Sequence, residues 1–412
     1  MPERNTKVSK VQFSKYQVFV VGVLTFLQFT IILDFMILSP LGAILMPALK
    51  ITPSQFGMVV SVYAFSAGLS GVLASGFADR YDRKKILLFF YGGFLLSTLF
   101  CGLAPNFHVL LVARMMTGIF GGVIGSIVMA ITTDLFPIEA RGRVMGFIQT
   151  AFAASQILGL PFGLFLANHW GWHFPFHLIV AVGTGAGILI WKYLKPIDAH
   201  LKQHPDTHPL HHFLQTIKNP TYLKAFAAVA LLSTGGFMIM PFASAFSVNN
   251  LKVAMGDLPM VYMTTGIVSI LTGPFIGRAS DAIGKYQVFL FGSALSIIMV
   301  LIYTHLEVTP LSTIMVINAA MFVGISMRMI PSQALMSAVP KPLSRGAFMS
   351  ISSSIQQISG GLASVVAGMI VTASPTGRIE HFNVIGYIVV GTTILTVLLM
   401  YAIHRHIREK VD

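Results

Sequence analysis

Residues 54–104 read SQFGMVVSVYAFSAGLSGVLASGFADRYDRKKILLFFYGGFLLSTLFCGLA. Two apolar runs, 54–77 and 85–104, are joined by a short segment, 79–85, that carries six charged residues. An apolar run of about 20 residues spans the hydrocarbon layer of a bilayer as a helix. The stretch therefore predicts two transmembrane helices joined by a tight charged loop on one side of the membrane.

The same pattern recurs along all 412 residues. The chain is 55% hydrophobic and only 10% charged, whereas a soluble protein carries about 25% charged residues. This composition excludes a soluble globular enzyme, a disordered chain and a DNA-binding protein. It predicts an all-α membrane protein with twelve transmembrane helices, at about 16–44, 54–77, 85–104, 107–135, 143–168, 173–193, 222–247, 258–277, 286–304, 311–338, 346–373 and 384–403.

The positive charges fix an orientation. With the N-terminus in the cytoplasm, 22 of the 27 Lys and Arg fall on the inner side and 3 on the outer side, so both termini are expected in the cytoplasm. A polar stretch, 194–221, separates two six-helix halves, 1–193 and 222–412, and is expected to be a cytoplasmic linker. Short loops and the absence of a targeting segment favour a bacterial inner membrane.

Cofactor and metal sites have little support. The single cysteine, Cys101, excludes a disulfide framework, an iron–sulfur site and a thiolate zinc site. Histidines 200, 204 and 208 follow helical spacing, but Pro205 and Pro209 would break a helix that presented them. We therefore expect no cofactor and no bound metal.

The two halves share features at a nearly constant offset. Phe35-Met36-Ile37 matches Phe237-Met238-Ile239 at a shift of 202 residues, and Asp79 matches Asp281. At the same shift Arg114 falls on Val316 and Asp34 falls on Gly236. Repeated halves with a site between them are typical of secondary transporters.

Four motifs carry a family resemblance. They are SGFADRYDRK at 75–84, RMMTG at 114–118, GLPFG at 159–163 and LDFMILSP at 33–40. The first is similar to the G-x-x-x-D-R-x-G-R-K signature of the major facilitator superfamily, with Ser75 and Asp82 where the family usually has Gly. The others resemble motifs of proton-coupled members, of antiporters and of drug:proton antiporters. The chain thus resembles the twelve-span drug:proton antiporter or sugar-efflux branch over essentially its full length.

The resemblance implies a conformational latch on the inner side. In it Asp79 would meet the start of span eleven near Arg345, and Arg83 would pair with Asp134. A simpler interpretation is a solvated anchor, because basic residues are expected on the inner face anyway. The residues assigned to the latch are Asp79, Arg80, Arg83, Lys84, Asp134, Arg141, Asp281, Lys285 and Arg345.

Three ionisable residues other than His lie well within spans: Asp34, Arg114 and Arg328. Asp34 and Arg114 lie at similar depths, so they can form a pair. Burial favours the neutral form of a carboxyl group and a nearby guanidinium favours the charged form, so a change in their separation would load and unload a proton. Asp34 and Arg114 are therefore the candidates for proton coupling. The alternative is a fixed ion pair that locks two helices.

Arg328 carries the prediction about the substrate. With the central cavity that the resemblance implies, the three charges sum to +1 or +2, which disfavours lipophilic cations and favours anionic, zwitterionic or neutral polar compounds. The alternative is a structural charge bonded to backbone carbonyls near Pro331. The other polar residues assigned to the cavity are Gln149, Gln156, Asn318, Gln333, Gln357 and Tyr63. Glycines at 118, 121, 122 and 125 in span four, and at 360 and 368 in span eleven, predict close helix packing.

The sequence thus predicts a secondary active transporter, not an enzyme, that works by alternating access. We expect proton-coupled export of a small polar, anionic or drug-like molecule, driven by the proton gradient. Its partners would be the substrate, protons and the lipid bilayer, without nucleic acid, and it would be a monomer. Alternatives are an uptake symporter or a facilitator for a sugar-like or organic-acid nutrient. A membrane sensor, an intramembrane enzyme and a channel have less support, because there is no catalytic pair and no continuous polar stripe.

Overall fold

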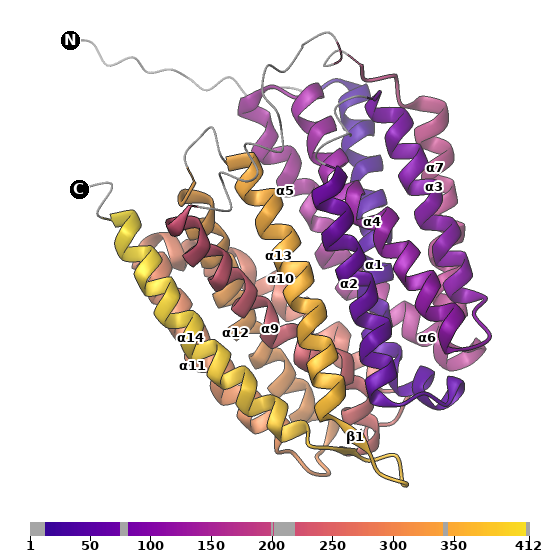
Figure 1. Cartoon of the computed structure of the whole chain (residues 1–412), viewed down its shortest axis with the longest axis vertical. Helices are drawn as coiled ribbons and strands as arrows, with labels where there is room; N and C mark the ends of the chain where they lie inside the picture. The colour runs from indigo at the N-terminus through magenta and orange to yellow at the C-terminus, as the bar shows by residue number, and fades with distance from the viewer. Residues whose placement is uncertain (1–12, 75–80, 199–200, 202–218, 341–344, 409–412) are drawn as a thin grey trace.

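The computed structural model describes residues 13–74, 81–198, 201, 219–340 and 345–408. In this part of the chain almost all residues are helical (Figure 1), as expected where no water is present to satisfy backbone polar groups. The N half (13–198) contains α1 (Lys15–Leu49), α2 (Pro53–Ala74), α3 (Arg83–Gly102), α4 (Phe107–Leu135), α5 (Ile138–Ala154), the π-helical segment η2 (Ser155–Gly159), α6 (Leu160–Trp170) and α7 (Phe174–Tyr193).

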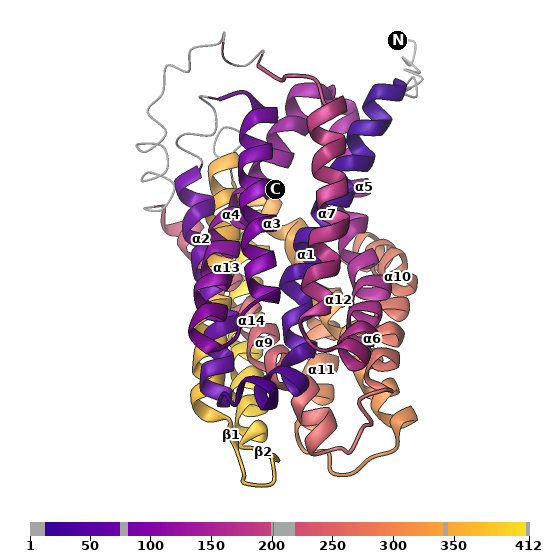
Figure 2. The ribbon, with the colours of Figure 1, turned by 90° about the vertical axis from the view of Figure 1, so that its right-hand side faces the viewer.

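The C half (219–408) repeats this plan. It contains α9 (Pro220–Asn249), α10 (Leu258–Ile283), α11 (Lys285–Thr304), α12 (Leu311–Ala338), α13 (Arg345–Ile370) and α14 (Phe382–Arg408). A two-stranded antiparallel hairpin, β1 (Thr372–Ala373) and β2 (Ile379–Glu380), joins α13 to α14. The hairpin, which the sequence did not predict, marks one end of the bundle, and the first turn of α1 lies towards the other end (Figure 2).

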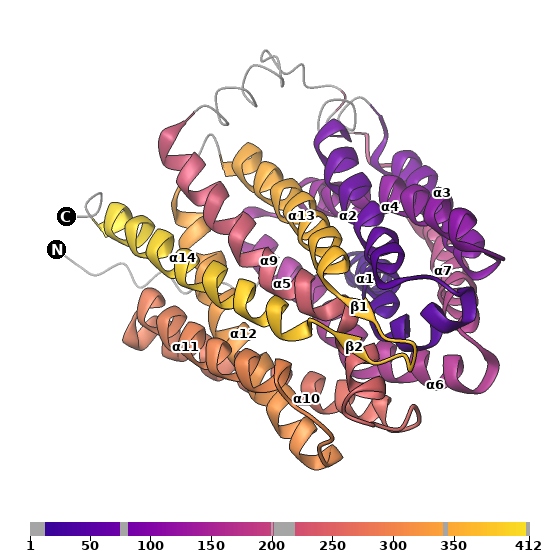
Figure 3. The same cartoon turned by 60° about the horizontal axis from the view of Figure 1, so that its bottom comes forward.

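All twelve predicted spans are helices, and span five is formed by α5, η2 and α6 together. Within the described residues, eleven spans are long and apolar enough to cross a membrane. The exception is α13, whose sequence is rich in Ser and Gln. It packs against α2 of the N half and α9 of the C half (Figure 3), so its polar residues are largely turned to protein. Most of the predicted linker lies outside the described residues.

Small residues bring α2 and α13 together at the boundary of the halves. A Cβ atom at Gly57 would lie 2.8 Å from the Ser364 carbonyl oxygen, and one at Gly68 would lie 3.0 Å from that of Ser354. Within the N half, Gly118 and Gly122 of α4 press against the backbone of Tyr63 and Ala67 in α2. These contacts confirm the predicted packing role of glycines in span four, and Gly368 of span eleven packs likewise, since a Cβ atom there would lie 3.1 Å from the Pro53 carbonyl oxygen. Gly125 is an exception, since a Cβ atom there would meet nothing within 4 Å.

The buried apolar residues form three clusters at different positions along the length of the helix bundle. The shared core combines residues of both halves, such as Ile37 and Leu164 with Phe242 and Phe382, and lies at the hairpin end. At the other end the halves have separate cores. The N-half core contains residues such as Leu24, Phe94 and Ile127, and the C-half core contains residues such as Phe226, Phe348 and Met400. The halves are therefore joined by one core at the hairpin end and keep individual cores at the opposite end.

Candidate functional site

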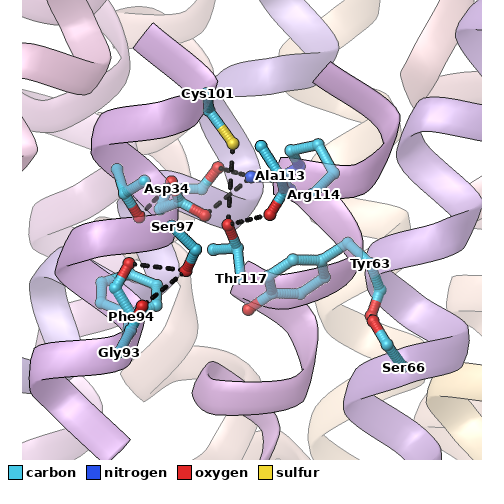
Figure 4. A network of polar contacts seen from close by, with 11 residues as sticks. Asp34, Tyr63, Ser66, Gly93, Phe94, Ser97, Cys101, Ala113, Arg114 and Thr117 are labelled. Atoms are coloured by element: carbon cyan, nitrogen blue, oxygen red, sulfur yellow. Dashed lines mark hydrogen bonds and ion pairs between the residues drawn. The ribbon is translucent and has the colours of Figure 1, made fainter. Parts of the chain in front are cut away.

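A buried ion pair lies inside the N half (Figure 4). The Arg114 Nη1 atom of α4 donates to Asp34 Oδ2 of α1 at 2.7 Å and also lies 3.4 Å from the Asp34 carbonyl oxygen. Asp34 is 0% exposed and Arg114 is 1% exposed. The sequence predicted that these two residues could pair, and they do.

Residues of α2 and α3 complete the surroundings of the pair. Thr98 donates a hydrogen bond of 3.2 Å to Asp34 Oδ1. The Arg114 guanidinium lies over the ring of Tyr63, 4.5 Å from its centroid, a favourable cation–π geometry. Cys101 Sγ lies 3.6 Å from the Thr117 hydroxyl. Helices α1 to α4 thus enclose the pair, so in this conformation the open chamber expected around Asp34 and Arg114 is not found, and Tyr63 lies beside the pair rather than in an open cavity.

An aromatic chain leads from the pair to the other half. Phe35, the residue after Asp34, contacts Tyr63 at 5.3 Å and Phe237 of α9 at 5.8 Å between ring centroids. One turn further on, the Ser244 hydroxyl of α9 donates to the Ser39 carbonyl of α1 at 3.0 Å. The main chain that carries Asp34 is therefore part of the contact between the halves.

Span five approaches the pair from another side. Ser155, the first residue of η2, donates from its hydroxyl to the Phe29 carbonyl of α1 at 3.2 Å. A Cβ atom at Gly159 would lie 2.6 Å from Leu33, the neighbour of Asp34, and one at Gly266 of α10 would lie 2.8 Å from Ile157. The π-helical segment thus contacts both α1 and the C half. Segments of this kind are frequent at functional sites, and GLPFG at 159–163, with its proline, was the signal in the sequence.

Arg328 lies on the buried face of α12 and is 6% exposed. Its Nε atom has no hydrogen-bond partner, and within the described residues the guanidinium has no ion pair. The alternative in which backbone carbonyls near Pro331 bind this side chain therefore has no hydrogen bond in its support. Val316, matched to Arg114 by the repeat, is 68% exposed, so these two positions do not share an environment.

The other residues predicted for the cavity differ in their burial. Asn318 is buried but donates to the Ile314 carbonyl of its own helix at 3.0 Å. Gln149 and Gln333 are exposed, Gln357 is half-buried, and Gln156 is buried within η2. Gln149 and Gln156 thus differ in environment, and the π-helical segment begins between them.

One pair of the predicted latch is present. Arg83 Nε lies 3.2 Å from Asp134 Oδ2, with side chains that are 6% and 23% exposed. Asp82, not assigned to the latch, caps α3 by accepting from the Lys84 amide. Arg141 donates to the carbonyls of Thr133 and Phe136.

The rest of the latch is exposed or undescribed. Asp281 and Lys285 form an exposed pair at 3.4 Å. Asp79, Arg80 and the side chain of Arg345 lie outside the described residues, so the predicted contact of Asp79 with the start of span eleven stays a prediction.

Comparisons with known proteins agree with this architecture. The sequence profile of the Major Facilitator Superfamily matches residues 24–245 and 225–411. The chain is 26% identical to the MFS-type transporter YceJ of Bacillus subtilis (strain 168), over 90% of this chain and 92% of that protein. It is 22% identical to a probable sugar efflux transporter of Helicobacter pylori (strain G27), over 66% of this chain and 68% of that one.

Solved structures share the fold. A bacterial homologue of the human lysosomal transporter Spinster, in an inward-facing and unoccupied conformation, superposes with a TM-score of 0.69 at 16% identity, over 95% of this chain and 96% of that one. A mutant of the nucleoside transporter NupG gives 0.75 at 14% identity, over 93% and 98%. The fold, the motifs and the profile agree: the chain is a multi-pass membrane transporter, not an enzyme, and belongs to the major facilitator superfamily.

Proposed function

We propose that the protein is a proton-coupled exporter of a small polar or anionic molecule and that the Asp34–Arg114 pair is its proton-sensitive element. It would act as a monomer in a bacterial inner membrane, with both termini in the cytoplasm, and would use the proton gradient without a cofactor. Export is supported by the sugar efflux relatives. The single observation that carries the proposal is the 2.7 Å ion pair buried among four membrane helices.

Protonation of Asp34 would remove the charge that Arg114 faces. Breaking a buried ion pair by loss of one partner costs about 3–5 kcal/mol. A two-state equilibrium moves from 1:99 to 99:1 with about 5.5 kcal/mol. The free-energy change on protonating this pair is therefore large enough to shift most of the population between two access states. A proton moving down a potential of 100 mV supplies about 2.3 kcal/mol to the cycle.

The contacts around the pair give this change a route to the other half. Arg114 lies on Tyr63, Tyr63 contacts Phe35, and Phe35 contacts Phe237 of α9. A guanidinium released from Asp34 would move off the Tyr63 ring and alter the packing of Phe35. Because Phe35 belongs to the contact between α1 and α9, protonation would act on the closure of the hairpin end.

The closed hairpin end supports alternating access. With the termini in the cytoplasm, the shared core would seal the outer side, and the separate cores would allow the inner ends to part. A solute would then enter from the cytoplasm in this state. The halves would then rock, Asp34 would take up a proton from the outer side as the solute leaves, and the return to this state would release that proton into the cytoplasm.

Everted membrane vesicles would test the proposal. Respiration acidifies their lumen, and an exported solute that enters in exchange for protons would dissipate the gradient. Acridine-orange fluorescence would report that loss while sugars, nucleosides, amino acids and organic acids are added in turn. We expect recovery of fluorescence with the wild type for at least one solute and none with Asp34→Asn. Gradient-driven transport that persists in Asp34→Asn would overturn the role of Asp34, and solute accumulation only in right-side-out vesicles with acid outside would indicate an uptake symporter.

A further inference from the structure

Each half of the molecule has a buried layer of small and polar residues between two apolar cores. In the N half this layer contains Asp34, Thr98 and Arg114. In the C half, every buried residue between the shared core and the C-half core, on all five helices that contribute to both, is Ser, Thr, Gly, Pro or Arg. We call this the C-half polar layer. Ser233 of α9, Ser296 of α11, Arg328 of α12, Ser352 of α13 and Thr396 of α14 represent it.

The two layers have corresponding cations. Arg114 lies on the fourth span of the N half and Arg328 on the fourth span of the C half. Arg114 is neutralised by Asp34 at 2.7 Å. No acidic residue belongs to the C-half polar layer, because those described in the C half lie in loops or at helix ends, at positions 257, 281, 307 and 380. The N-half layer is electrically neutral, whereas the C-half polar layer carries one uncompensated positive charge.

Hydrogen bonding in the C-half polar layer is also incomplete. Arg328 Nε, Ser296 Oγ and Ser352 Oγ are buried without a hydrogen-bond partner. Ser296 lies against Gly324, at 2.7 Å from the position of a Cβ atom there, and Gly324 is one helical turn before Arg328 on the same face of α12. By contrast Ser233 and Thr396 donate to carbonyls of their own helices. Of the two unpartnered hydroxyls, that of Ser296 therefore lies in the part of α11 that packs on α12 beside Arg328.

These buried donors without acceptors lower the stability of the folded protein when no ligand is bound. A buried polar group that lacks a partner is destabilising, and a buried unpaired charge more so. The missing group must be an acceptor, must be anionic and must be small enough to enter between helices. A carboxylate fits, because its two oxygens match the planar guanidinium and its remaining lone pairs can accept from serine hydroxyls.

We infer that the C-half polar layer binds the carboxylate of a small organic anion, with Arg328 as its counter-ion and Ser296 as a second donor. The bound carboxylate would have the same relation to Arg328 as Asp34 has to Arg114. This inference rests on the proposed transport function, since the anion is taken to be the exported solute, and it narrows the substrate class to organic carboxylates.

The test measures binding without any gradient, so that it can fail independently of proton coupling. The purified full-length protein in detergent micelles would be unfolded by heat in the presence of sodium acetate, lactate, benzoate or succinate. Lactamide and benzamide serve as uncharged partners of the same shape, and sodium chloride corrects for ionic strength. A ligand that binds only the folded state raises the unfolding midpoint, and the rise continues with the logarithm of its concentration above Kd. We expect at least one carboxylate to raise the midpoint and its amide to leave it unchanged.

Variants assign the effect to this layer. Arg328→Gln should weaken the affinity at least about tenfold, since it removes a charge-assisted pair. Arg328→Lys should retain part of the wild-type affinity. The matched control is Arg378→Gln, which removes an arginine from the β1–β2 hairpin, outside the C-half polar layer. The unliganded Arg328→Met protein should unfold at or above the wild-type midpoint, because an unpaired buried charge is lost, and this result checks that the variants fold.

The outcomes are decisive in either direction. Stabilisation that is specific for carboxylates, retained in Arg378→Gln and lost in Arg328→Gln, supports the inference. No stabilisation by any of the four carboxylates, or equal stabilisation of wild type and Arg328→Gln, overturns it. A carboxylate that binds but drives no dissipation of the gradient in everted vesicles would instead count against the proposed proton-coupled export.

Discussion

The side-chain amide of Asn168, near the end of α6, donates a hydrogen bond of 2.8 Å to the carbonyl oxygen of Met255. This bond joins the N half to the loop before α10 in the C half. Two other bonds cross the same boundary, from Ser244 to the Ser39 carbonyl and, at 3.4 Å, from Ser364 to the Gly57 carbonyl. All three lie in the part of the molecule that contains the shared core, so polar and apolar contacts close the same end.

Removing these bonds should loosen the hairpin end. A hydrogen bond contributes about 1 kcal/mol net, so Asn168→Ala combined with Ser244→Ala should raise the population open at the hairpin end by roughly thirtyfold. Distances between spin labels on α6 and α10 would report that population. Asn383→Ala is a matched control, because its amide lies in the first turn of α14 and has no described hydrogen bond to the N half. An unchanged distance distribution in the double variant would show that the bonds do not hold the closure.

The buried pair makes a prediction about stability that is separate from transport. Asp34→Ala should lower the free energy of unfolding by about 3–5 kcal/mol, because Arg114 is left charged and unpaired. The double variant Asp34→Leu/Arg114→Met should recover most of that loss, since apolar residues of similar volume replace the pair. Thermal unfolding in micelles would measure both. The recovered protein should still lack gradient-driven transport, and normal transport by it would mean that the pair is only structural.

The Arg83–Asp134 pair should matter more than the Asp281–Lys285 pair. The former is largely buried and the latter is exposed. Arg83→Ala should therefore destabilise the protein by about 1–3 kcal/mol, whereas Lys285→Ala should leave stability nearly unchanged. Chemical denaturation of the two variants side by side would compare them. Equal effects would indicate that burial does not set the strength of these pairs.

Glycines on one face of α4 provide a steric test. A Cβ atom at Gly118 would collide with the carbonyl oxygen of Tyr63, whereas one at Gly125 would meet nothing. Gly118→Ala should separate α4 from α2, disturb Tyr63 and Arg114, and lower the unfolding midpoint. Gly125→Ala on the same helix should be neutral or stabilising by up to about 1 kcal/mol, because alanine favours the helix. If both substitutions were equally harmless, the close approach of α2 and α4 would not be required.

The fold could be predicted from the sequence because each span is a long apolar run with its own signature. The Asp34–Arg114 pair could also be predicted, since two opposite charges at similar depth in one half have few other partners. The enclosure of that pair could not, because it depends on Tyr63 and Thr98 approaching from α2 and α3. The burial of Gln156 within a π-helical turn could not be predicted either, because such a turn has no strong sequence signal beyond the nearby proline. The lack of an ion pair at Arg328 could not be predicted, because it depends on where the neighbouring carboxylates lie in the folded protein.

The two halves share an apolar core at only one end, and this bears on how readily the protein would leak ions. Opening at the hairpin end must hydrate the interface that both halves share, whereas parting the opposite ends leaves each individual core intact. In the proposed export cycle, an empty carrier would thus rest with its exit side closed and only its entrance side open. Without cargo and a proton to offset the exposed surface, it would rarely turn over, and the ion gradient of the cell would not drain through idle molecules.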